Sequence, residues 1–77
     1  MTEPLRLVFH ATVRLAERGV TEDDVRSALN HPIGNPSPGN RSGRLLYRGY
    51  AKGRVLVVVR SASDGVIITV YWEGQRA

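Results

Sequence analysis

The sequence of 77 residues contains no cysteine, one tryptophan, one phenylalanine and two histidines. Without cysteine, neither disulfides nor thiolate metal sites can reinforce the fold. The histidines, His10 and His31, are far apart in the chain and have no cysteine near them, so we expect no bound metal and no cofactor. A chain this short has room for one small core, and we expect one domain over residues 1–77.

Long hydrophobic segments are missing as well. The longest apolar run, Val55 to Val59, is far shorter than the roughly 20 residues that a membrane-spanning helix needs. The segment from Met1 to Phe9 lacks the basic start and long apolar stretch of a secretion signal. Together with the absence of cysteine, these features predict a cytoplasmic protein that does not enter a membrane.

Acidic residues are few relative to basic ones, which gives a net charge of +4. Every basic residue except Lys52 is an arginine, whose planar fork binds phosphate through two parallel hydrogen bonds. The composition therefore fits an anionic partner such as nucleic acid. An excess of this size also fits a protein that simply stays soluble.

Apolar spacing and turn residues predict the order of the elements. The expected elements are a short extended segment from Leu5 to Phe9, a helix from His10 to Arg18, a helix from Thr21 to about Asn30 or His31, and strands from Leu45 to Tyr50, Arg54 to Arg60 and Val66 to Trp72. Gly19 is suited to the left-handed residue after a helix, and Thr21 to the N-cap of the next one. The buried stripes of the helices are predicted as Ala11, Leu15 and Ala16, and Val25, Ala28 and Leu29.

The stretch from Ile33 to Gly43 is rich in Pro, Gly, Asn and Ser and is predicted to be a mobile loop. It lacks the Gly-Lys-Ser/Thr ending of a phosphate-binding loop. The fold class that follows is α+β, with two N-terminal helices packed on one face of a small, mainly antiparallel sheet of three or four strands.

Alternation along the last strand separates Ile67, Thr69 and Tyr71 from a more aliphatic set that includes Ile68, Val70 and Trp72. We expect the aliphatic set to face the helices, so that Thr69 and Tyr71 lie on the open face beside Arg48. The sequence does not fix the register of these strands. An open face that displays Tyr47 or Tyr71 also favours self-association, so we expect a homodimer or a protein partner.

A basic stripe marks the first helix, where His10, Arg14 and Arg18 recur at intervals of four residues beside the predicted buried stripe. Their stems can pack against the sheet edge while their polar ends reach a groove between helix and sheet. In the alternative interpretation the stripe is a solvated face, with Glu17 as a local ion-pair partner and Arg18 favoured by the helix dipole.

The pattern His10-Ala11-x-x-Arg14-x-x-x-Arg18-Gly19-Val20-Thr21-x-x-Asp24-Val25, followed by the Gly/Pro loop, the segment Arg44 to Tyr50, a valine-rich strand and Ile68-Thr69-Val70-Tyr71, resembles domain-of-unknown-function family 4258. That family is similar to the RelE/ParE-like toxin superfamily, with BrnT-type toxins among the nearer relatives. The resemblance implies a RelE-like fold with two N-terminal helices on an antiparallel sheet. It also implies a toxin of a bacterial or phage toxin-antitoxin system, with RNA as ligand and an antitoxin-like protein as partner.

A ribonuclease of this kind needs a proton acceptor, a proton donor and fixed positive charge, but no metal. The candidate catalytic residues are His10, as base or acid, and Tyr71, for proton transfer or base stacking. The candidate phosphate-binding residues are Arg14, Arg18, Arg48 and Arg60. The structural alternatives are a His10 bonded to a backbone carbonyl at a helix start and a Tyr71 that fills the core.

Two functional hypotheses therefore stand side by side. In the first, the protein is a toxin-like, metal-independent endoribonuclease that acts on RNA. In the second, it is a non-catalytic module of the same fold that binds a protein or a nucleic acid through its open sheet face. The second hypothesis predicts affinity without turnover, and a steep salt dependence where the ligand is nucleic acid.

Overall fold

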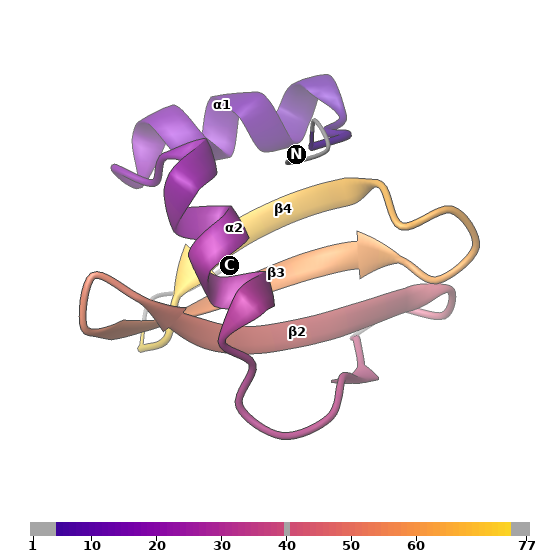
Figure 1. Ribbon diagram of the computed structural model, residues 1–77. Coiled ribbons are helices and arrows are strands. Elements are labelled where there is room, and N and C mark those ends of the chain that lie inside the picture. The colour runs from indigo at the N-terminus through magenta and orange to yellow at the C-terminus, as the bar shows by residue number, and fades with distance from the viewer. Residues whose placement is uncertain (1–4, 40, 75–77) are drawn as a thin grey trace.

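The computed structural model describes residues 5–39 and 41–74 and shows two helices over one face of a four-stranded sheet (Figure 1). The elements are α1 (Phe9–Glu17), α2 (Glu22–Asn30), β1 (Ser37–Pro38), β2 (Arg44–Ala51), β3 (Arg54–Ser61) and β4 (Ile67–Trp72). The strand order is β1-β2-β3-β4, and every neighbouring pair is antiparallel. Helix α1 packs against β4, and α2 packs against β2 and β3. The predicted α+β class is confirmed.

The two helices are joined by the short turn that the sequence predicts. Gly19 takes a positive φ of 64° after α1, and the amide of Val20 donates to the carbonyl of Leu15 at 2.9 Å. Thr21 then caps α2: its hydroxyl accepts from the amide of Asp24 at 3.1 Å, and its own amide donates to the Asp24 carboxylate at 3.0 Å. This reciprocal pair is a capping box, which fixes where α2 begins.

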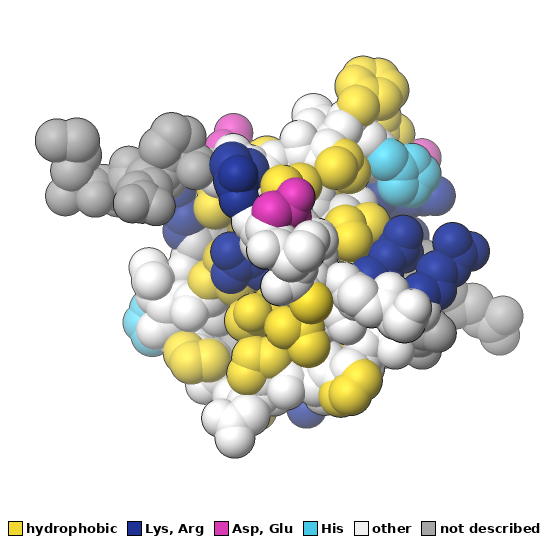
Figure 2. Space-filling model, turned by 90° about the vertical axis from the view of Figure 1, so that its right-hand side faces the viewer, with side chains coloured by type: hydrophobic (Ala, Val, Ile, Leu, Met, Phe, Trp, Pro, Cys, Tyr) yellow, Lys and Arg dark blue, Asp and Glu magenta, His cyan; other side chains and the backbone are white. Residues whose placement is uncertain are grey.

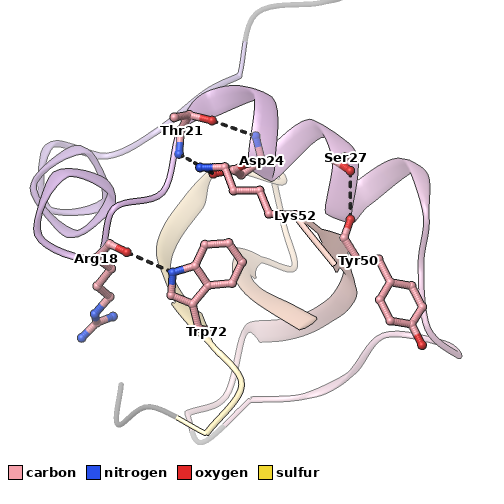
Figure 3. A network of polar contacts seen from close by, with 7 residues as sticks. All are labelled: Arg18, Thr21, Asp24, Ser27, Tyr50, Lys52 and Trp72. Carbon is pink, nitrogen blue, oxygen red and sulfur yellow. Dashed lines mark hydrogen bonds and ion pairs between the residues drawn. The ribbon is translucent and has the colours of Figure 1, made fainter. Parts of the chain in front are cut away.

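Asp24 also ties α2 to the turn between β2 and β3. Its carboxylate is almost fully buried and forms an ion pair with Lys52 at 3.0 Å (Figure 3). Lys52 and Gly53 form a two-residue hairpin loop in which both residues have positive φ, as a type I′ turn requires. One carboxylate thus holds a helix start and a hairpin together.

Helix α2 approaches the sheet most closely at Gly49. A Cβ placed on Gly49 would lie 1.8 Å from the carbonyl oxygen of Ala28, so only glycine fits at this position. Beside this contact, the Ser27 hydroxyl donates to the carbonyl of Tyr50 at 2.9 Å, and the Tyr50 amide donates to the carbonyl of His31 at 3.1 Å. The helix therefore lies directly on the β2 backbone.

The core lies between the helices and the sheet and is built mainly from small aliphatic side chains. Its buried members are Ala11, Leu15, Val20, Val25, Ala28, Ala51, Leu56, Val58, Ile67, Val70 and Trp72. Tyr47 packs against this core, so of the two tyrosines considered for the open face only Tyr71 lies on it. Ala16 was expected in the buried stripe of α1 but is exposed, because α1 turns the flank that carries Ala11 and Leu15 toward β4.

A β-bulge changes the faces of β4. Val59 lies opposite Thr69 while Arg60 lies opposite Ile67, so Ile68 has no partner across the ladder. As a result Ile67 is buried in the core, and Ile68 lines a surface pocket. The expectation from simple alternation was wrong for these two residues and right for Val70 and Trp72, which face the helices.

The edges of the sheet differ from the sequence prediction. The segment from Leu5 to Phe9 contributes only a parallel bridge between Leu7 and Ile67, because the chain turns into α1 directly afterwards. The additional strand is β1, inside the stretch predicted as a loop, where Ser37 and Pro38 pair with Leu46 and Leu45. Neither helix is long and apolar enough to cross a membrane, among the residues that the structure describes.

Candidate functional site

A pocket of about 450 Å³ lies where the flank of α1 meets β4 and the sheet face that α2 does not cover. Its basic side chains come from the helix, the loop before β2 and the start of β2, and they are His10, Arg14, Arg41 and Arg44. Its remaining lining comes from three adjacent strands and consists of Leu46, Val59, Ile68, Thr69 and Tyr71. No acidic side chain lines it among the described residues. In the space-filling view, a histidine lies close to several Lys and Arg side chains on one side of the molecule (Figure 2).

The strand register explains how the sheet side of the pocket is built. Leu46, Val59 and Thr69 lie opposite one another across β2, β3 and β4. Tyr71 occupies the next position on the same face of β4, opposite Val57. Val59 is buried and, with Leu46, gives the pocket an apolar floor, while Thr69 and Tyr71 place a hydroxyl and a phenol along one wall.

The helix side of the pocket is held by a chain of three side chains. The Nε of Arg14 donates to the Nε2 of His10 at 3.2 Å, and its Nη1 binds the Glu17 carboxylate at 2.7 Å. In this arrangement Nε2 is an acceptor, which requires the neutral imidazole with its proton on Nδ1. The predicted ion pair with Glu17 is therefore present, and the same arginine also lines the pocket.

Three of the four arginines predicted to bind phosphate lie outside this pocket. Arg18 donates through Nη1 to the carbonyl of Val70 at 2.6 Å, because the end of α1 rests on the backbone of β4. Arg48 lies opposite Val57 on the open face and is paired with Glu73. Arg60 donates to the carbonyl of Gly65 at 3.0 Å and lies over the ring of Tyr47.

Two other arginines, Arg41 and Arg44, line the pocket in place of the three that lie outside it. Arg44 shares the face of Leu46 and Arg48 by alternation along β2. If the predicted strand is extended by one residue to begin at Arg44 instead of Leu45, the same alternation places Arg44 on the open face. Arg41 comes from the loop before β2, where no periodicity indicates the direction of a side chain.

The groups of the pocket suit an anion more than a metal. Three guanidiniums supply hydrogen bonds and positive charge for a phosphate, and an imidazole and a phenol can exchange protons. No cluster of three or more histidine, cysteine or carboxylate side chains that could hold a metal ion occurs in the described part of the chain.

Fold and pocket together define a small α+β protein with a cationic surface pocket. Residues 7–72 match the model of the family described as Domain of unknown function (DUF4258), and the chain belongs to that family. No curated protein and no solved structure matches the chain.

Proposed function

We propose that the protein is a toxin-like, RNA-directed endoribonuclease of the RelE/ParE type that works without a metal ion. The observation that carries this proposal is the convergence of His10, Tyr71 and three arginines on one pocket whose lining, within the described residues, contains no acidic side chain. Each part of a phosphodiester-cleaving site has a counterpart there. An antitoxin-like protein that covers the pocket is the partner that this function implies.

In the proposed reaction, the 2′-hydroxyl of a ribose attacks the neighbouring phosphorus. His10 Nε2 accepts the proton from the 2′-oxygen, the new O2′–P bond forms, and the P–O5′ bond breaks. Tyr71 donates its phenolic proton to the departing 5′-oxygen. The products are a 2′,3′-cyclic phosphate and a 5′-hydroxyl, and no oxidant or cofactor is consumed.

Arg14 links binding to this chemistry. In the free protein the Nε of Arg14 donates a hydrogen bond, at 3.2 Å, to the Nε2 of His10, which is the atom that has to accept the proton. A bound phosphate competes for the same guanidinium and draws it away from Nε2, which becomes available as a base. Arg41 and Arg44 then hold the charge that develops on the phosphorane.

The test is an RNA cleavage assay with the purified protein and an end-labelled RNA. We expect 2′,3′-cyclic phosphate ends, a loss of rate of about 10²- to 10⁴-fold in His10→Ala, and a similar direction of change in Tyr71→Phe. Arg48→Ala is the matched control, because it removes one guanidinium from the open face outside the pocket. Cleavage that persists in His10→Ala at the wild-type rate would contradict the assignment.

A non-catalytic module is the second candidate function, and one observation favours it. His10 Nε2 already accepts a hydrogen bond from Arg14, so in the free protein the lone pair that a general base needs is engaged in shaping the pocket. For this candidate we expect RNA to bind with a strong salt dependence and to be recovered intact after long incubation. The same cleavage assay therefore separates the two candidates.

A further inference from the structure

The first residue of α1, Phe9, is the most exposed large hydrophobic side chain in the described part of the chain. Its exposed fraction is 83%, and Val8 and Val13 next to it are each 38% exposed. A large apolar ring in water is unfavourable by itself, and an exposed apolar strip commonly marks a contact surface. The question is which ligand this strip contacts.

The strip runs alongside the basic side of the pocket. At about 100° per residue, Phe9 and Val13 share one line along α1, and His10 and Arg14 share the neighbouring line. Ala11 and Leu15 occupy the buried side of the helix and fix its orientation. Because His10 and Arg14 line the pocket, a ligand held there lies at the border of the apolar strip.

We propose that Phe9 is a stacking platform for an unpaired nucleobase of a single-stranded nucleic acid whose phosphates occupy the pocket. This inference rests on the proposed function and adds the strandedness of the substrate and a residue that selects it. Bases stack on aromatic rings in single-strand binding sites, while neighbouring cations hold the backbone. A paired base inside a duplex has both faces covered and cannot use the ring.

Charge argues against a second copy of the chain at this strip. A symmetric contact through Phe9 would bring two cationic pockets of a protein with net charge +4 toward each other. An apolar protein surface that extended over the pocket would cover Arg41 and Arg44 without offering an anion to them, which is costly. A nucleotide suits both the apolar strip and the cationic pocket, because its base is flat and apolar and its phosphate is anionic.

The test measures the affinity for a fluorescent 2′-O-methyl oligoadenosine of eight nucleotides, which cannot be cleaved through its 2′-oxygen. We expect Phe9→Ala to weaken binding roughly five- to hundredfold and Phe9→Trp to retain it, with quenching of the new tryptophan upon binding. Tyr50→Ala is the matched control, because Tyr50 is an exposed aromatic (54%) that does not line this pocket. Circular dichroism confirms that each variant is folded.

An abasic oligomer with the same number of phosphates and a fully paired duplex complete the experiment. We expect Phe9→Ala and the wild type to bind each of these two probes equally. Unchanged affinity of Phe9→Ala for the single strand, or an equal loss for the abasic oligomer, would overturn the inference. A loss of dimer in light scattering, with unchanged oligonucleotide affinity, would assign the strip to a second copy. Cleavage of unmodified RNA by the wild type reports separately on the proposed function.

Discussion

The indole Nε1 of Trp72 donates a hydrogen bond to the carbonyl oxygen of Arg18 at 2.9 Å, and the Arg18 side chain donates to the carbonyl of Val70 at 2.6 Å. The end of α1 and the end of β4 are therefore joined in both directions, and Figure 3 shows the bond from Trp72 to the Arg18 carbonyl. The Trp72 ring is 3% exposed and lies beneath the guanidinium of Arg54, 4.4 Å from the ring centroid.

For Trp72→Phe we expect a loss of about 2 kcal/mol in the free energy of unfolding, because the indole donor disappears and the smaller ring leaves space. Urea denaturation followed by circular dichroism measures this loss.

Arg18→Ala should also lower stability while leaving RNA affinity close to that of the wild type. A large loss of affinity with unchanged stability would return Arg18 to the phosphate-binding group.

For Gly49→Ala we expect a loss of about 3 kcal/mol or more, because the new methyl group overlaps the carbonyl oxygen of Ala28 and α2 has to move off the sheet. Gly53→Ala is the control: it lies at a positive φ of 70° with open space around its Cα, so it should cost only about 1 kcal/mol. Thermal and urea denaturation of both variants measure the difference. A loss at Gly49 no larger than the loss at Gly53 would show that the contact with α2 does not select glycine at position 49.

Asp24 gives the stability of the protein a pH dependence. Burial works against its ionisation, but the hydrogen bonds from the Thr21 amide and from Lys52, with the charge of Lys52, outweigh it and lower the pKa of Asp24 below its ordinary value of 3.8. A carboxyl group with a lowered folded-state pKa stabilises the fold above its unfolded-state pKa, and this contribution disappears as the pH falls through the folded-state pKa.

We therefore expect Asp24→Asn to be destabilising at neutral pH, and the difference from the wild type to shrink below about pH 4. Asp23→Asn is the control at the next position of the same helix turn, where the side chain is 96% exposed. Urea denaturation curves recorded from about pH 2 to about pH 7 provide the measurement. A difference that stays constant over the whole range would rule out the ionised carboxylate as its cause.

The salt dependence of RNA binding tests the arginines of the pocket. Each phosphate neutralised on a single strand contributes about 0.7 to the slope of log affinity against log salt. We expect the double variant Arg41→Ala/Arg44→Ala to reduce the slope by roughly 1.4, and Arg48→Ala to change it much less. Fluorescence anisotropy titrations at several salt concentrations give the slopes, and similar slopes for both variants would place the phosphates elsewhere.

Most of the fold could be predicted because its signals are local. Thr21 with the acidic residues after it defines a helix start, and Gly19 defines a helix end. The edge strand β1 could not be predicted, since a Ser-Pro pair in a loop has no strand periodicity. The predicted faces of Ile67 and Ile68 were the reverse of the observed ones, because the bulge is set by the pairing with β3, which the sequence of β4 does not reveal.

The candidate site could be predicted from the sequence only in part. His10, Arg14 and Tyr71 were chosen from helical spacing and strand alternation, and they do line one pocket. Arg18 belongs to the same helical stripe and Arg48 follows from the same strand alternation, yet both of them, and Arg60, instead contact a carbonyl, a carboxylate or a ring in their own neighbourhood. Arginine identity alone says little about direction, because the side chain is long and finds whichever acceptor the fold places within reach.

The unpaired Ile68 lets a single short strand serve two environments, since Ile67 belongs to the interior and Thr69 and Tyr71 belong to the pocket wall. Removal of Ile68 would leave Ile67, Val70 and Trp72 on one face and Thr69 and Tyr71 on the other by strict alternation, so the core would keep its side chains and only the pocket lining would lose one. The bulge therefore lets β4 carry one extra apolar side chain into the pocket lining without displacing Ile67, Val70 or Trp72 from the interior.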